Sequence, residues 1–174
     1  ITQPGLIYSE MKQAYDNNAR QEWIVNIHDP KPAAYDLELF MDMAWNINSV
    51  SPSTINNHLG NWLIREFGEN AGKKLLPVMQ EYYRLCGIRR PEHMGWTQVE
   101  LDKATNVRGM SWMKDTEFSN EFGGEMDRYL EHYADIKKAV EDIKQDIADE
   151  KRDAYFSHIE YQVCAAADMA TKML

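Results

Sequence analysis

The chain combines one short apolar run near its start with long segments in which apolar residues recur every three or four positions. Residues 23–27 read WIVNI, and this β-branched run predicts a β-strand from Trp23 to His28. Before it, residues 4–16 have helical spacing, and Pro4 suits the first turn of a helix. Helical spacing resumes after Pro30 and Pro32 and continues almost to the end. The pattern therefore predicts a mainly α protein with a single strand.

The helical part reads as an antiparallel bundle of about four to five helices. Ser51 followed by Pro52 predicts a helix start, Gly68 predicts a helix end, and Pro77 predicts a kink or a restart. The predicted helices cover residues 35–45, 52–67, 70–86, 124–149 and the segment that follows the charged turn at 149–153.

Two of these helices have distinctive faces. The helix over 35–45 is apolar on most sides, so we expect it to be well buried. Apolar positions between 126 and 147 alternate steps of three and four, which is typical of a coiled-coil-like seam.

Residues 88–118 show no sustained period and are expected to form a long loop. Loops of this length are uncommon in compact domains and are often functional. An ordered loop packed over the bundle by Trp96 and Trp112 is an equally good interpretation. The sequence leaves both open.

Composition narrows the classes of partner. With 174 residues, 44% hydrophobic and 27% charged, the chain is typical of a soluble globular domain. Its net charge of −9 argues against nucleic acid, and no apolar stretch approaches the roughly 20 residues of a membrane span. The basic pairs 89–90 and 137–138 sit among acidic residues and are interpreted as solvated surface.

The sequence also argues against a metal or a cofactor. A di-metal carboxylate site in a bundle needs Glu three residues before a His, and none of the four histidines tested in this way has one. Nucleophile elbows and phosphate-binding loops are not found. We therefore predict no metal and no cofactor.

One polar cluster remains. Asn26, His28, Asp29 and Lys31 follow the predicted strand, where a strand-to-helix connection begins. In α/β barrels the substrate-binding groups come from this edge of the sheet.

Two motifs in this region resemble a known family. Residues 23–32 read WIVNIHDPKP and residues 40–46 read FMDMAWN. They are similar to the patterns W-[IL]-V-N-V-G-D-L-K-P and F-F-L-D-[ML]-A-W-N of glycoside hydrolase family 115, the xylan α-glucuronidases. His28 and Pro30 replace a glycine and a leucine of the pattern. Further matches run in order along nearly the whole chain: Trp62, FG at 67–68, YY at 82–83, RRPE at 89–92 and RDAYF at 152–156.

The resemblance implies an architecture. A lone strand cannot satisfy its backbone hydrogen bonds. In this family the missing strands would belong to a TIM-type barrel upstream in the same polypeptide. Residues 1–33 would then be the last helix and eighth strand of that barrel, and residues 34–174 a helical accessory domain with the long loop at 88–118.

The resemblance also implies an activity. Family members remove glucuronic or 4-O-methylglucuronic acid from glucuronoxylan with inversion, which needs two carboxyl groups about 6.5–9.5 Å apart. The family's catalytic residues lie mainly on earlier barrel strands, so we expect no catalytic residue here and no activity from this chain alone. A secreted or periplasmic location would follow from the same resemblance.

Three residues are the candidate substrate-binding positions. Asn26 is expected to line the sugar pocket, Lys31 to meet the uronate carboxylate as a point charge, and Asp29 to orient the loop. Hydrogen bonding within the turn is an alternative role for each of them.

The rival interpretation is a non-enzymatic helical module for protein interaction or dimerisation. In that case the 126–147 seam would meet a partner helix, and the strand would pair with another protein's sheet edge. A homodimer is compatible with both interpretations.

Overall fold

A computed structural model of the chain describes residues 1–91, 101–102, 107–108 and 123–173. Within these ranges the protein is mainly helical, as predicted. The helices are α1 (Pro4–Asp16), α2 (Ala34–Trp45), α3 (Ile55–Phe67), α4 (Glu69–Ile88), α5 (Glu125–Ile143), α6 (Arg152–Tyr155) and α7 (Tyr161–Met173). Short 3₁₀ turns, Lys144–Asp146 and Asp149–Lys151, connect α5 to α6, and a π-helical turn, Phe156–Glu160, joins α6 to α7.

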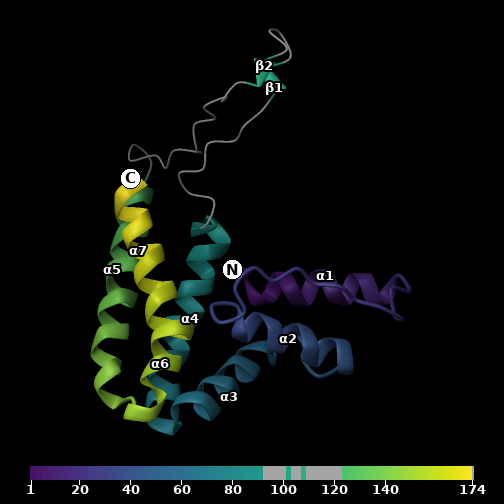
Figure 1. The fold of residues 1–174 in the computed structure, drawn as a ribbon, viewed down its shortest axis with the longest axis horizontal. Helices are drawn as coiled ribbons and strands as arrows, with labels where there is room; N and C mark the ends of the chain where they lie inside the picture. Colours follow the sequence, from purple (N-terminus) through teal and green to yellow (C-terminus); the bar gives the residue numbers. More distant parts are fainter. Residues whose placement is uncertain (92–100, 103–106, 109–122, 174) are drawn as a thin grey trace.

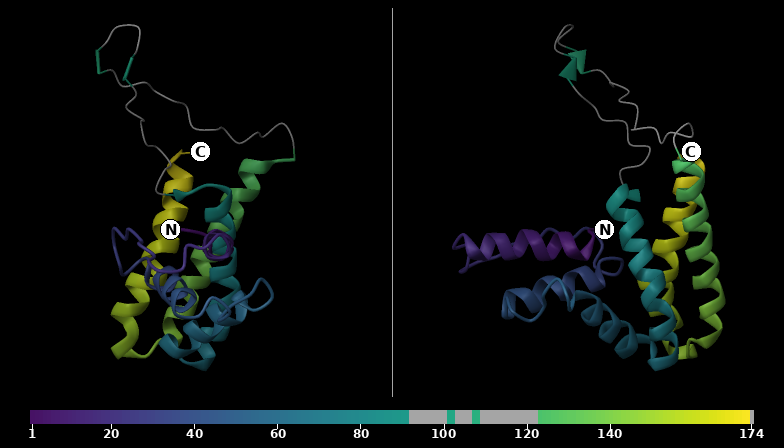
Figure 2. Two further views of the ribbon diagram at one scale, coloured as in Figure 1. Left: turned by 90° about the vertical axis from the view of Figure 1, so that its right-hand side faces the viewer. Right: turned by 180° about the vertical axis from the view of Figure 1, so that it is seen from behind.

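The long helices form the antiparallel bundle. Helices α4 and α5 and the rod made by α6 and α7 stand side by side in Figure 1, and α5 contacts both α4 and α7. Helix α3 packs against α4, and Gly68, with a φ of +84°, makes the turn between them. Helices α1 and α2 lie against one another and project sideways from the bundle, as Figure 1 and the right view of Figure 2 show.

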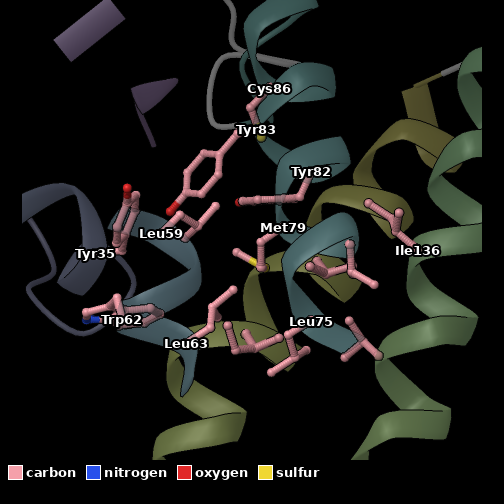
Figure 3. Close-up of a cluster of buried hydrophobic side chains, with 14 of the residues drawn as sticks. Tyr35, Leu59, Trp62, Leu63, Leu75, Met79, Tyr82, Tyr83, Cys86 and Ile136 are labelled. Atoms are coloured by element: carbon pink, nitrogen blue, oxygen red, sulfur yellow. The ribbon is translucent and has the colours of Figure 1, made fainter. Parts of the chain in front are cut away.

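The core lies between α3, α4, α5 and α7, and the inner face of α2 packs against it. Figure 3 shows Leu63 and Leu75 pointing toward one another, with Met79 beside them and Ile136 reaching in from α5. Leu63 and Leu75 are fully buried. The predicted seam over 126–147 is also buried inside this chain, since Tyr133 and Val140 of α5 and Ile147 just after it are at most 3% exposed. The seam is therefore occupied by the chain's own helices, which removes the partner helix that the rival interpretation placed there.

The prediction that α2 is buried on most sides is wrong within this chain. Its inner face is buried through Tyr35, Leu39 and Met43, but Met41 is 56% exposed and Trp45 is 93% exposed. Periodicity detected the apolar residues, but not which of them have a neighbour in this chain.

Two local predictions also need correction. Helix α3 begins at Ile55, because residues 51–54 form a turn in which Ser51 N donates to Thr54 Oγ1 (2.9 Å) and Ile55 N donates to Ser51 O (3.0 Å). Helix α4 is continuous from Glu69 to Ile88, so it does not restart at Pro77 and it ends one residue beyond Gly87. Packing of the faces of α4 on both sides of the proline outweighs the hydrogen bond that it removes.

The predicted loop at 88–118 lies mostly outside the described residues, including Trp96 and Trp112. Its described part contains two short strands, β1 (Leu101–Asp102) and β2 (Val107–Arg108), which the sequence reading did not anticipate. They pair antiparallel with each other, with Leu101 opposite Arg108.

None of the helices in the described ranges combines the length and apolar character that a bilayer crossing requires.

Candidate functional site

The predicted strand at residues 23–28 has no strand partner in the described part of the chain. β1 and β2 pair only with each other, and residues 21–28 take part in no backbone hydrogen bond with the described residues. Trp23 packs on Phe40 of α2, with 5.8 Å between the ring centroids, whereas Ile24 is 81% exposed and Val25 is 42% exposed. The segment is therefore held at one end, and the side chains of Ile24 and Val25 remain largely uncovered.

A cavity of about 870 Å³ lies where this segment, α2, the end of α4 and α7 meet. Much of its wall is apolar, for example Ile7, Leu37 and Ala165. Its polar and charged lining residues include Asn26, His28, Asp29, Asp36, Arg90 and Gln162. An apolar wall with a few polar groups is the usual composition of a small-molecule site.

The structure brings two of the three predicted site residues to this cavity. Asn26 and Asp29 line it, and Asp29 O also accepts from Ala33 N (3.3 Å) in the turn that leads into α2. Lys31 is exposed and is not among the lining residues. Its positive charge acts instead on His158, whose pKa it helps to lower.

Sequence reasoning missed Gln162 and Arg90, which come from the helical part. Gln162 is 6% exposed, on the face of α7 that also buries Val163 and Ala166. A polar side chain on an otherwise small and apolar face was the available signal. Arg90 follows the end of α4; its side chain is exposed, as predicted, and it also lines the cavity.

The π-helical turn fixes the position of Gln162. Its Nε2 donates to the backbone O of His158 (2.6 Å), while its buried Oε1 has no hydrogen-bond partner in the described part of the chain. One N–H of the amide is therefore held by the backbone, and the unpaired polar atom of this side chain is the acceptor oxygen. π-turns inside α-helices occur frequently at functional sites.

His158 lies behind this wall, with its ring 6.1 Å from that of Trp62. Burial lowers the pKa of His158 below its ordinary value of 6.5; Lys31 adds to this shift and Glu66 opposes it. His158 is therefore neutral in the folded protein at pH 7.

We expect this shift to make the free energy of unfolding depend on pH. Between the lowered pKa and 6.5, the unfolded chain binds a proton at His158 that the folded chain does not, so stability falls as the pH drops through this window. His158→Gln should flatten the profile between pH 7 and pH 5.5, measured by urea unfolding at each pH. Equal slopes for the two proteins would contradict the prediction.

A second polar cluster joins α2 to α3. Side-chain atoms of Glu38, Asp42 and His58 lie within 4.8 Å of one another, an arrangement that could hold a metal ion. Both Glu38 oxygens already accept from Arg65 (2.8 and 2.6 Å), and His58 Nε2 lies 3.0 Å from Asp42 Oδ2. The cluster is thus accounted for as an ion-paired connection between helices.

Comparison with known proteins identifies the family. The sequence model of Glycosyl hydrolase family 115 matches residues 1–93, more than half of the chain. The chain belongs to glycosyl hydrolase family 115. The resemblance found in the two motifs of residues 23–32 and 40–46 is thereby confirmed.

A solved structure of this family is similar along the whole chain. It is described as a novel family GH115 4-O-methyl-alpha-glucuronidase with specificity for decorated arabinogalactans, and it is 41% identical in sequence with a TM-score of 0.85. The match covers 99% of this chain and 22% of that one, so the chain spans about a fifth of its structural relative. None of the curated proteins matches the chain.

Proposed function

We propose that this chain is the part of an α-glucuronidase in which a TIM-type barrel ends and a helical domain begins. Residues 1–33 would supply the last helix and eighth strand of the barrel, and residues 34–174 the helical domain. The observation that carries the proposal is the unpaired segment at 23–28, with Ile24 81% exposed. Backbone N–H and C=O groups of a buried strand need partners, and a neighbouring barrel strand would provide them.

The exposed apolar side chains support the same arrangement. Ile24, Val25, Met41 and Trp45 belong to the unpaired segment and to α2, and each is at least 42% exposed. Further barrel elements of the same polypeptide would cover apolar surface of this kind and stabilise the protein by about 25 cal/mol per Å² removed from water.

In this proposal the reaction is the release of glucuronic or 4-O-methylglucuronic acid from a polysaccharide side chain with inversion. The acid and base carboxyl groups would come from other barrel strands, and this chain would contribute binding groups. The Asn26 amide both donates and accepts hydrogen bonds and suits sugar hydroxyls. Asp29 would orient the loop, and Lys31 would act as a more distant positive charge.

The polymer that carries the uronic acid is either glucuronoxylan or an arabinogalactan. Xylan is the substrate that the motif resemblance implies, and the structural relative is described as specific for decorated arabinogalactans. Both polymers bear the same terminal sugar acid, so one binding cavity serves either case.

The helical domain would buttress the barrel and close one side of the cavity. Homodimer formation belongs to the same proposal, and light scattering on the complete gene product measures it. The alternative, a non-enzymatic interaction module, needed the seam over 126–147 to be exposed for a partner helix. That seam is buried within this chain, so the alternative is less well supported.

The test is Asn26→Ala in the complete gene product. We expect kcat/KM for release of 4-O-methylglucuronic acid to fall about 10-fold to 100-fold, since one or two hydrogen bonds to the sugar are lost. Asn57→Ala on α3 is the control, because Asn57 is exposed and does not line the cavity. Unchanged activity of the Asn26 variant would remove Asn26 from the sugar pocket. No release by the unmodified protein from either polymer would overturn the proposed function.

A further inference from the structure

We propose that Arg90, rather than Lys31, is the residue that recognises the carboxylate of the sugar acid, and that Gln162 binds a hydroxyl of the same sugar. The inference rests on the proposed function and assigns the helical domain a direct part in substrate specificity.

The first argument is the position of positive charge. A uronic acid differs from a neutral sugar by one carboxylate, and a site selects it most directly with a cation. Among the described residues that line the cavity, Arg90 is the only lysine or arginine. Asp29 and Asp36 line it as well, so an anion is repelled from their side and is stabilised near Arg90. The Asp29 carboxylate suits hydroxyl groups instead, as an acceptor.

The second argument is that the guanidinium of Arg90 is unpaired within the described part of the chain. Other arginines of this protein have carboxylate partners: Arg65 donates twice to Glu38, and Arg84 donates twice to Glu81. Arg90 has no hydrogen bond or ion pair with any residue in the described ranges, and its side chain is exposed. Its planar fork matches a carboxylate bidentately, whereas a lysine provides only a point charge.

The third argument comes from Gln162. A side chain that is 94% buried and lines the cavity holds its Nε2 against the His158 carbonyl and leaves Oε1 unpaired within the described part of the chain. A buried, unpaired acceptor is unfavourable by about 1–3 kcal/mol. A hydroxyl donor in the cavity removes that penalty. A neutral amide acceptor selects a hydroxyl and not the carboxylate, which again places the carboxylate at Arg90.

Tyr161 completes the set as an apolar surface. It is 53% exposed, lies next to Gln162 in the sequence and lines the same cavity. Its ring can cover the C–H face of a sugar while the polar groups bind the ring substituents. Together these residues provide a guanidinium, an amide acceptor and an aromatic face, which fits a sugar acid.

The experiment measures discrimination in the complete gene product. Two oligosaccharides are compared, one with 4-O-methylglucuronic acid and one in which that carboxyl group has been reduced to an alcohol. We expect Arg90→Gln to lower kcat/KM on the acid about 10-fold to 150-fold, the equivalent of one charge-assisted contact, and to change it less than 3-fold on the reduced sugar. Arg90→Lys should recover part of the loss. A purely structural role for Arg90 would lower both rates equally.

Two controls and a binding measurement complete the design. Arg84→Gln on α4 should behave as the unmodified protein, because Arg84 is paired with Glu81 and does not line the cavity. The Lys31→Gln variant should keep the preference for the acid over the reduced sugar. If Lys31→Gln loses this preference and Arg90→Gln keeps it, the inference is wrong. Calorimetric titration with free glucuronate and with glucose separates the two proposals. If glucuronate binds in an Arg90-dependent way but no polymer is hydrolysed, the inference holds and the proposed function fails. If glucuronate does not bind, or binds equally well without Arg90, and Arg90→Gln leaves the preference for the acid unchanged, the inference alone is overturned.

Discussion

Replacing Trp62 with alanine is expected to lower the free energy of unfolding by about 3–5 kcal/mol. Trp62 is 4% exposed and connects three parts of the fold. Its ring lies 5.5 Å from that of Tyr35 on α2, 6.2 Å from Phe67 on α3 and 6.1 Å from His158 in the π-helical turn. Figure 3 shows Trp62 beside Tyr35 at the edge of the core. The neighbours come from separate elements and cannot all move in to fill the space, so a cavity should remain.

The measurement is chemical unfolding of the purified chain, and the matched control is Trp45→Ala. Trp45 is 93% exposed, so the same substitution there should change the unfolding free energy by no more than about 0.5 kcal/mol in either direction. Similar losses at positions 45 and 62 would show that the described core is not the one present in solution.

The second large effect is expected at Gly72, inside α4. Alanine is a better helix former than glycine by about 1 kcal/mol, so local propensity alone predicts that Gly72→Ala stabilises the protein. The packing predicts the opposite. A Cβ at position 72 would lie 2.6 Å from the Cα and 2.7 Å from the backbone N of Ile64 on α3. Backbone atoms cannot rotate away, so α3 and α4 would have to separate. We expect a net loss of about 2–3 kcal/mol.

Gly87→Ala in the same helix is the matched control. Among the described residues, a Cβ at position 87 would meet only the Gln3 side chain, at 3.5 Å, which is an ordinary contact. This variant should be as stable as the unmodified chain or slightly more stable, because only propensity acts. Thermal and urea unfolding of both variants give the comparison. A stabilised Gly72 variant would refute the close approach of α3 and α4.

Some helices and strands could be predicted from the sequence more accurately than others. Helix α5 could be read from the sequence, because its apolar residues repeat at steps of three and four and a buried face requires that spacing. The start of α3 could not be read as well, since Ser51 and Pro52 are equally suited to the turn that precedes the helix. The strand at 23–28 was predicted from local composition, but a strand needs a ladder, and no partner is present in the described part of the chain.

The candidate site divides in the same way. Asn26 and Asp29 were found because polar residues after a strand follow a general rule of α/β architecture. Arg90 and Gln162 lie about 60 and 130 residues further along the chain. No local signal connects them with Asn26, because what places them at one cavity is the packing of α4 and α7 beside α2. Lys31 stands close to Asn26 in the sequence, yet proximity along the chain did not bring it into the cavity.

By itself, then, the sequence determined the helical class, the apolar face of most helices and, through the motifs at 23–32 and 40–46, the family. These features depend on residues near one another in the chain, where spacing and side-chain type act directly. Only the tertiary structure decided which apolar residues are covered, why Gly72 must lack a side chain and which charged group faces the cavity. Each of these depends on contacts between distant segments, and the free energy of such contacts is fixed by how whole helices pack and not by any single stretch of residues.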